Sequence, residues 1–158
     1  MAVEIVNLGR VLRKLEDVKK TLFSKRVFAL IGEYIKATIK ARDTETHVDA
    51  EGKSFGQYSD RYAKVRQEAG YPIDHVYLDW SGQMHAAMTS DARSDRVDVF
   101  FRNMSHAPTS GSSGSSVSTS AEIAYHLNQH RKFFALSTKQ IDKILEIYRE
   151  EIRRSLRR

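Results

Sequence analysis

The sequence predicts an α+β fold: long N-terminal helices, a small antiparallel sheet, a long C-terminal helix and a long Ser/Gly-rich internal loop. Three observations predict it. Apolar residues recur every three or four positions near both ends of the chain, apolar and polar residues alternate over 96–102, and residues 109–120 read TSGSSGSSVSTS. Because 158 residues suit one ordinary domain, we expect residues 1–158 to form a single domain.

The N-terminal helical segment is expected over residues 8–39, where two apolar stripes follow one another. The pattern permits a break near residues 21–24. The first stripe comprises Leu8, Val11, Leu12, Leu15, Val18 and Leu22, and the second comprises Val27, Leu30, Ile31, Tyr34, Ile35 and Thr38. We interpret both as core or subunit interface, because such stripes usually serve packing.

The middle of the chain carries weaker signals. Residues 43–54 are polar without helical period and are expected to form a loop. Residues 57–69 fit a short helix that ends at Gly70, with Pro72 just beyond as a stop signal. Residues 80–87 fit one or two further helical turns.

A strand is expected over residues 96–102. Val97, Val99 and Phe101 alternate with other residues, which places them on one face of the strand. Residues 93–95 would form the turn from a preceding strand over 88–92. The sheet is therefore expected to be small and antiparallel.

The Ser/Gly-rich stretch is expected to be a flexible loop over about residues 105–120, because its composition cannot build a core. The final helix follows a capping-box pattern, with a hydroxyl at Ser137 and a glutamine at Gln140. Its apolar stripe comprises Ile141, Ile144, Leu145, Tyr148, Ile152 and Leu156.

The formal net charge of +6 is unevenly distributed along the chain. Residues 1–42 carry ten Lys and Arg against four Asp and Glu, residues 43–130 carry seven against twelve, and residues 131–158 carry nine against four. Basic ends and an acidic middle fit a nucleic-acid-binding surface, subunits that meet basic face to acidic face, or solvated helix faces alone.

No catalytic pattern is complete, so we expect no enzyme activity, no cofactor and no metal. The chain has no cysteine, which excludes disulfides, thiol chemistry and Cys-ligated zinc. His126 and His130 would share a helix face, but no glutamate follows His126 as it would in a zinc protease.

Four acidic residues alternate with other residues in the loop after the first helices: Asp43, Glu45, Asp49 and Glu51. Their spacing is similar to that of a calcium loop, yet Val48 stands where such a loop needs glycine. We favour a solvated acidic loop or a docking surface for a basic neighbour.

An ordered series of short motifs carries a resemblance. G-x-x-F-x-x-Y-S-x-x-Y-A-x-x-R runs over residues 52–66, L-D-W-S-G-Q-M over 78–84 and R-K-F-F-A-L-S over 131–137. Between the last two come Ala121, Ala124, Tyr125, His126 and Gln129. This order resembles the phage virion-morphogenesis family of tail-completion and neck proteins. The resemblance covers roughly residues 30–158.

For the motif residues themselves we predict structural roles. The spacing of Phe55, Tyr58 and Tyr62 fits a helix that packs one face against the sheet. Gly82 is expected at a turn or a close backbone approach, in the same motif as Met84. Either Phe133 or Phe134, just before the last helix, is expected to act as a hydrophobic staple against it.

The resemblance implies a tail-completion, tail-terminator or head–tail connector subunit that forms a homo-oligomeric ring, expected to be a hexamer. It also implies contacts with other tail and neck proteins and a place in the virion after assembly in the host cytoplasm. A ring around passing DNA would meet it without sequence readout.

Each subunit of such a ring offers two different, complementary faces. Opposite charges at the ends and in the middle of the chain would supply this complementarity. The interface candidates are the basic residues Arg153, Arg154, Arg157 and Arg158 and the acidic residues Asp43, Glu45, Asp49 and Glu51.

Two alternatives stay open. A small basic nucleic-acid-binding protein would account for the charge and would bind DNA with a steep salt dependence. A metal-dependent enzyme that uses His126 and His130 is the weaker alternative. A membrane partner is not expected, because no signal peptide is visible and no stretch approaches the roughly 18 apolar residues of a membrane helix.

Overall fold

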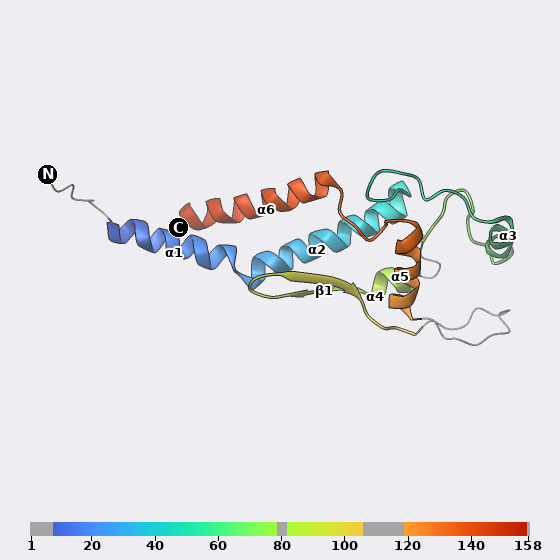
Figure 1. The fold of residues 1–158 in the computed structure, drawn as a ribbon, viewed down its shortest axis with the longest axis horizontal. Helices are drawn as coiled ribbons and strands as arrows, with labels where there is room; N and C mark the ends of the chain where they lie inside the picture. The colour runs from blue at the N-terminus through green and yellow to red at the C-terminus, as the bar shows by residue number, and fades with distance from the viewer. Residues whose placement is uncertain (1–7, 79–81, 106–118, 158) are drawn as a thin grey trace. The chain divides into compact units, whose positions relative to one another are not determined.

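The computed structural model describes residues 8–78, 82–105 and 119–157, and the chain divides into two compact units (Figure 1). Unit 1 comprises residues 1–34, 90–98 and 138–158, and unit 2 comprises residues 35–89 and 99–137. The described residues form helices and one two-stranded antiparallel sheet, which confirms the α+β fold.

The predicted N-terminal helical segment is two helices, α1 (Leu8–Leu22) and α2 (Lys25–Ala41). The break that the pattern permitted is therefore real. It lies at Phe23 and Ser24, where the Ser24 hydroxyl accepts a hydrogen bond from the Val27 amide at 3.3 Å. This bond satisfies one of the amides that lack a partner at the start of a helix.

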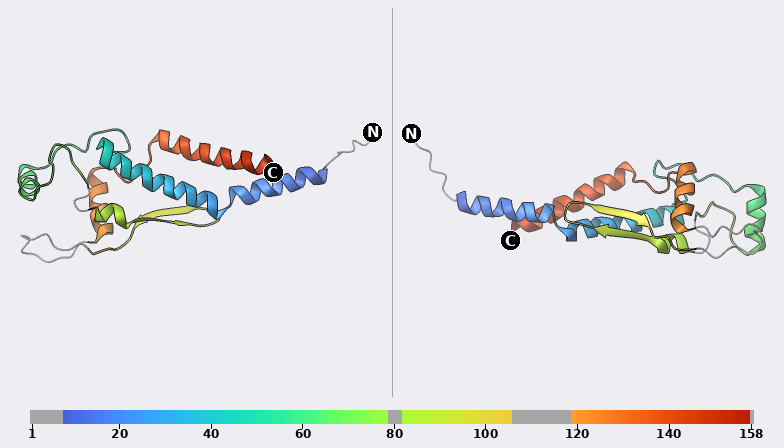
Figure 2. Two further views of the ribbon diagram at one scale, coloured as in Figure 1. Left: turned by 180° about the vertical axis from the view of Figure 1, so that it is seen from behind. Right: turned by 60° about the horizontal axis from the view of Figure 1, so that its bottom comes forward.

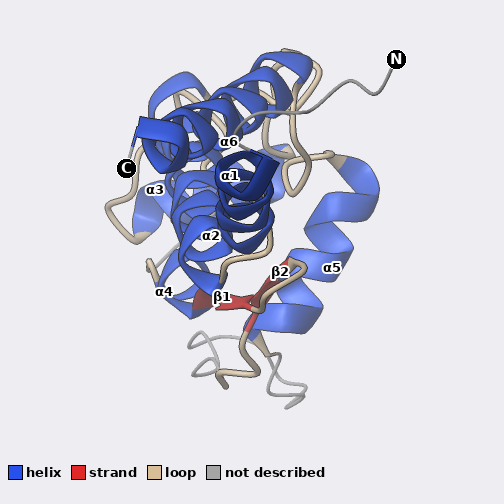
Figure 3. Ribbon diagram, turned by 90° about the vertical axis from the view of Figure 1, so that its left-hand side faces the viewer, coloured by secondary structure: helices blue, strands red, loops and turns tan. Residues whose placement is uncertain are grey.

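Unit 1 is built on the packing of α6 (Thr138–Arg157) beside α1 (Figure 2). Lys14 Nζ donates to the Leu156 carbonyl at 3.1 Å, and the rings of Phe28 and Tyr148 meet edge to face at 5.9 Å. In the view along the helices, α1 and α6 lie next to each other (Figure 3). The start of α6 at Thr138 agrees with a cap at Ser137.

The sheet is a hairpin of β1 (Met88–Ala92) and β2 (Val97–Phe101), as predicted. The Arg93 amide donates to the Arg96 carbonyl at 2.8 Å and closes the turn. Val97, Val99 and Phe101 are partly buried, whereas the residues between them are exposed, which confirms the predicted alternation.

Unit 2 contains a π-helical turn at Arg42–Thr46, α3 (Asp60–Glu68), α4 (Gln83–Ala87) and α5 (Ser120–His130). Helix α3 starts three residues later than predicted and stops before Gly70, whose φ is +79°. Helix α4 starts after Gly82, whose φ of +77° confirms the predicted turn. Residues 79–81, within the predicted helical turns at 80–87, lie outside the described residues.

Helix α5 begins with a capping box that the sequence analysis missed. The Thr119 hydroxyl accepts from the Glu122 amide, and the Glu122 carboxylate accepts from the Thr119 amide at 2.9 Å. Ser105 and Thr119 form an antiparallel bridge, which joins the ends of the predicted Ser/Gly-rich loop. Residues 106–118 of that loop lie outside the described residues.

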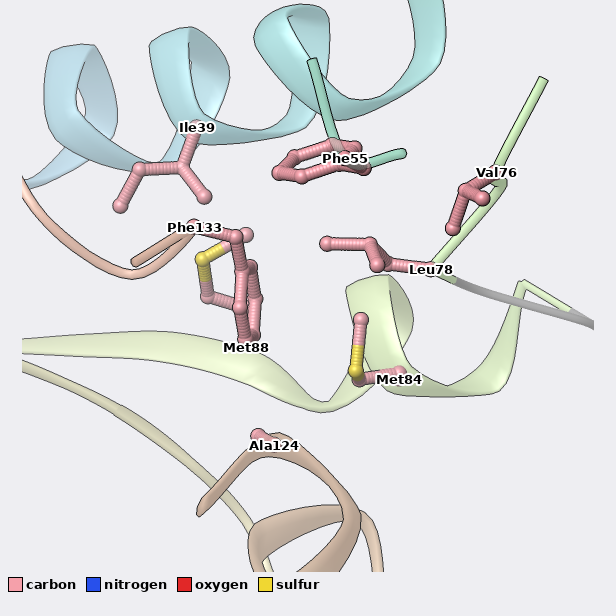
Figure 4. Close-up of a cluster of buried hydrophobic side chains, with 8 residues drawn as sticks. All are labelled: Ile39, Phe55, Val76, Leu78, Met84, Met88, Ala124 and Phe133. Carbon is pink, nitrogen blue, oxygen red and sulfur yellow. The ribbon is translucent and has the colours of Figure 1, made fainter. Parts of the chain in front are cut away.

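The core of unit 2 gathers side chains from α2, α4, α5, β1 and the segments between them (Figure 4). It consists of Ile39, Phe55, Val76, Leu78, Met84, Met88, Ala124 and Phe133. Each fully buried side chain of this kind stabilises a fold by about 1.5–3 kcal/mol.

One prediction for aromatic residues is wrong. Phe55 and Tyr58 precede α3, because Gly56 adopts a φ of +81° and Ser59 is extended, so the three aromatic residues do not form one helical face. A staple from Phe133 or Phe134 to the last helix stays a prediction: Phe133 belongs to the core cluster of unit 2, and Phe134 packs against that cluster. No helix in the described part of the chain has the length and hydropathy needed to span a membrane.

Candidate functional site

Unit 1 exposes large apolar side chains on both of its long helices. We call this set the apolar stripe; it consists of Leu12, Leu15 and Phe23 from the α1 region and Ile141, Leu145 and Leu156 from α6. The Lys14–Leu156 hydrogen bond places the last turn of α6 beside the turn of α1 that carries Leu12 and Leu15. Leu12, Leu15 and Leu156 therefore come from neighbouring parts of the two helices, whereas Ile141 and Leu145 lie near the start of α6, roughly three to four helical turns before Leu156.

The exposure of α1 is unusual for an amphipathic helix in a folded protein. Leu12 and Leu15 are 55% and 59% exposed, although they lie on the apolar face of the helix. Such a face normally packs against a core. Of the large apolar residues described in unit 1, only Val27 and Ile31 are buried, so this unit has a thin core of its own.

Basic side chains collect where α1 ends and α2 begins. The last turn of α1 carries Lys19 and Lys20, and α2 opens with Lys25 and Arg26 and no acidic residue in its first turn. Since the start of a helix is its positive end, these two side chains add to the local positive potential.

A cavity of about 460 Å³ lies in this part of unit 1. Three cations and two carboxylates line it together with three hydroxyl groups: Lys20, Arg26, Arg154, Asp17, Glu151, Thr21, Ser24 and Ser155, with Val27 beside them. Arg154 pairs with Glu151 at 2.7 Å, and Lys20 pairs with Glu16 at 3.8 Å. Carboxylates of the same unit therefore compensate part of the positive charge around the cavity.

The predicted basic interface residues lie on the last turns of α6. Arg153, Arg154 and Arg157 are exposed there, and Arg158 lies outside the described residues. This is the end of α6 that adjoins α1 through Lys14. The structure thus brings these arginines to the same unit as the apolar stripe.

The predicted acidic interface residues do not form one surface. The prediction that Asp43 lies on an interface surface is wrong. Asp43 is buried in the π-helical turn that follows α2, where its carboxylate contacts His85 and the Leu78 amide. Asp49 Oδ1 accepts from the amides of Glu51 and Lys53 at 2.8 and 2.9 Å, so its carboxylate closes a turn.

Glu51 is held by basic neighbours of its own chain. Lys132 Nζ lies 2.5 Å from its carboxylate, and Lys53 Nζ lies 2.9 Å from it. The hydrogen bond from Lys132, followed by that from Lys53, lowers the pKa of Glu51 to about 2. Glu45 is exposed on the π-helical turn.

The π-helical turn forms a buried polar hub in unit 2. Arg42 Nη2 donates to the carbonyls of Phe133 and Ala135, at 2.9 Å to the latter. His85 Nε2 lies 2.7 Å from Asp43 Oδ2. Burial lowers the pKa of the Arg42 guanidinium, against the opposing effect of Asp49 and Asp43. The hub therefore joins three segments that are distant in the sequence.

A second polar group is buried against tyrosine rings. Arg66 is 2% exposed, and its guanidinium carbon lies 4.9, 5.5 and 5.7 Å from the ring centres of Tyr58, Tyr71 and Tyr77. Arg66 Nε also donates to the Pro72 carbonyl at 3.3 Å. The Tyr58 hydroxyl accepts from the Tyr77 amide at 2.6 Å and donates to the Tyr77 carbonyl at 3.0 Å. This tyrosine clamp fixes α3 to the segment that follows it.

Five histidines are described, and all of them belong to unit 2. His126 and His130 lie four residues apart on α5, as the prediction of a common helix face requires, and both are exposed. The rings of His47 and His75 stack at 4.6 Å, and His47 Nδ1 lies 2.8 Å from the Asp43 carbonyl. Within the described residues, no three or more His, Asp or Glu side chains are arranged to hold a metal ion.

Sequence reasoning missed the partners in unit 2. Arg66 and Tyr58 belong to the quoted motif, but nothing local indicates that Tyr71 and Tyr77 meet them. The pairing of Asp43 with His85 also had no local signal. Polar residues flanking a helix end are far more often exposed than buried.

Comparisons with known proteins found no match: no family model, no curated protein and no solved structure is similar to this chain at a significant level.

Proposed function

We propose that this chain is a structural subunit of a tailed-bacteriophage virion, a tail-completion, tail-terminator or head–tail connector protein that assembles with copies of itself into a ring. The observation that carries the proposal is the meeting of the three family-like motifs in one core. Phe55, Met84 and Phe133 come from three separate motifs and belong to the same buried cluster. Motifs that are separate in the sequence therefore contribute to the same core.

Further motif residues also have structural roles. Gly82 begins α4 in a left-handed conformation, and Arg66 is enclosed by the tyrosine clamp. Residues that determine a core and its turns are the ones that related proteins would need to share. This agreement supports the resemblance as one of fold and assembly rather than of chemistry.

The surface of unit 1 supports the assembly part of the proposal. Large apolar side chains are exposed on two long helices, and exposed apolar surface of this kind marks interaction sites. Unit 1 carries sixteen Lys and Arg against eleven Asp and Glu, a charge of +5, so most of the net charge of the chain lies there. A ring subunit needs an apolar contact surface and charges that guide it, and unit 1 has both.

The mechanism of such a protein is geometric. A contact between two different faces repeats from subunit to subunit until the rotation closes the ring. The ring then ends or extends the tail tube, or joins it to the head, without a chemical step.

Two measurements test the proposal. The purified full chain, imaged by electron microscopy and weighed by light scattering, is expected to form rings of one copy number, a hexamer by our expectation. An antibody against the chain is expected to label particles of the encoding phage at the neck or tail end. Particles that contain the chain elsewhere, or that lack it, would contradict the proposal.

The basic junction of α1 and α2 favours one second candidate, a nucleic-acid-binding protein. Lys20, Arg26 and Arg154 line a cavity in unit 1 together with three hydroxyl groups and the carboxylates of Asp17 and Glu151, so the cations and hydroxyls could contact phosphate oxygens there. Such a protein would bind DNA as a monomer, with an affinity that falls steeply as salt rises. Binding titrations at several salt concentrations, combined with the mass of the free chain, distinguish the two candidates.

A further inference from the structure

Helix α1 carries a seven-residue apolar repeat, and unit 1 covers its apolar face only in part. Leu8, Leu15 and Leu22 are seven residues apart, and Val11 and Val18 fall between them at the same interval. Apolar residues in this alternating three-and-four spacing are typical of helices that pack lengthwise against another helix. Helix α6 ends beside Lys14, yet Leu12 and Leu15 remain more than half exposed.

Helix α6 has a corresponding exposed edge. Ile141 and Leu145 are four residues apart near its start, and both are exposed in unit 1. Tyr148 and Ile152 continue the same spacing and are partly buried, with Tyr148 against Phe28. The first two turns of α6 therefore expose two apolar side chains on one face of the helix, at the spacing by which helices pack against each other.

One charge of each sign lies beside the two strips. Lys19 lies close to Leu12 and Leu15 on the apolar face of α1, and Asp142 follows Ile141 on α6. Lys14 is engaged by the Leu156 carbonyl, and Glu146 is paired with Lys143 at 2.6 Å, so neither contributes to this comparison. Pairing α1 with a second copy of α1 would bring two Lys19 side chains together, which costs free energy, whereas pairing α1 with α6 of a second copy brings Lys19 towards Asp142.

We propose that α1 of one copy packs on the exposed start of α6 of a second copy, so that Leu12 and Leu15 cover Ile141 and Leu145. This inference rests on the proposed function, which it deepens by naming the partner and the two faces. The contact joins different faces of the two copies, so it leaves a free α1 at one end and a free α6 at the other. A contact of this type repeats and closes into a ring.

The apolar part of the contact is tested by Leu12→Asn/Leu15→Asn in the full chain. Both side chains are exposed in the single copy, so we expect unchanged helicity and unfolding but a dissociation constant raised roughly tenfold or more. The matched control is Val65→Asn/Ile73→Asn, which changes two exposed apolar residues of unit 2. The masses of all proteins are measured by light scattering over a concentration series.

The charges test which faces meet. Lys19→Glu alone and Asp142→Lys alone are each expected to weaken self-association. Mixing the two variants is expected to restore it, because the altered α1 then meets the altered α6 and the other two faces are unchanged. Lys20→Glu is the control, since Lys20 neighbours Lys19 in sequence but points about 100° away around the helix.

The outcomes separate this inference from the proposed function. Assembly that is lost in the leucine variant and restored by mixing Lys19→Glu with Asp142→Lys supports the α1–α6 contact. Wild-type assembly that withstands all these changes, or a chain that stays monomeric, overturns the contact. The proposed function fails on a different result, the absence of the chain from the neck and tail end of the particle.

Discussion

His85 Nε2 lies 2.7 Å from Asp43 Oδ2, and the two side chains are 5% and 3% exposed. The pair joins the π-helical turn that follows α2 to α4 within unit 2. Asp43 Oδ1 also faces the Leu78 amide at 3.4 Å, so the carboxylate connects two segments of the core. A carboxylate predicted to lie on a docking surface is thus part of the interior.

Replacing His85 with Phe is expected to remove one of the two polar groups that the buried Asp43 carboxylate contacts, leaving the Leu78 amide. Loss of the partner of a buried polar group destabilises a protein by about 1–3 kcal/mol. The free energy of unfolding in urea should fall by this amount, whereas Glu45→Gln on the exposed side of the same turn should change it by less than about 0.5 kcal/mol. Equal, small effects of the two changes would show that the pair contributes little.

Replacing Arg66 with Lys is expected to loosen the tyrosine clamp. A lysine keeps the charge but loses the planar group that lies against Tyr58, Tyr71 and Tyr77, and each desolvated contact of this kind contributes about 0.5–2 kcal/mol. We expect a loss of about 1–2 kcal/mol in unfolding free energy and a changed near-ultraviolet circular dichroism spectrum. Arg61→Lys on the exposed side of α3 is the control, and a spectrum unchanged in Arg66→Lys would contradict the clamp.

Replacing Gly32 with Ala tests the packing of α2 on the hairpin in unit 1. The added methyl carbon would lie 2.9 Å from Ser90 Cβ and 2.9 Å from Val97 Cγ2. Overpacking of this kind costs about 1–3 kcal/mol, more than the helix propensity gained from alanine, about 1 kcal/mol. Thermal unfolding should therefore shift to lower temperature.

Gly9→Ala is the matched control for that change. Gly9 lies in α1 with no atom within 4 Å of the added carbon, so the gain in helix propensity is expected to stand alone. The two changes should therefore move the unfolding temperature in opposite directions. If both changes shift the unfolding temperature in the same direction, Ser90 and Val97 move aside for the added methyl group at little cost in free energy.

The carboxyl group of Glu51 should titrate near pH 2 by nuclear magnetic resonance. Its folded pKa lies below the ordinary value of 4.5, so the stabilisation is present above pH 4.5 and is lost as pH falls from there towards 2. Lys132→Ala should raise this pKa more than Lys53→Ala, because the hydrogen bond from Lys132 contributes most. High salt should weaken the effect, since the pair is exposed.

Neutralising Arg153, Arg154, Arg157 and Arg158 with glutamine is expected to weaken assembly in low salt. These residues carry positive charge on the last turns of α6, and charge complementarity between copies guides association. Light scattering at low and high salt measures the effect. Assembly that is unchanged at low salt would count against a role of these arginines in the contact.

The secondary structure was largely predictable from local patterns. The hairpin at residues 88–92 and 97–101 followed from alternation and a turn, and α1, α2 and α6 followed from spacings of three and four. The capping box of α5 was missed although Thr119 and Glu122 show its spacing, and only His126 and His130 were expected to share a helix face there. The start of α3 was placed too early because the left-handed conformation of Gly56 is not evident from periodicity.

The sequence by itself determined which faces of the helices are apolar, where the strands lie and where the charges concentrate, because these depend on residues close together in the chain. Only the tertiary structure decided what covers each face. Asp43 and His85 meet because the π-helical turn and α4 come together in one unit, and Arg66 is enclosed because two loop tyrosines fold back onto it. Leu12 and Leu15 had the same apolar signal as a core residue, yet the described elements leave more than half of each side chain uncovered.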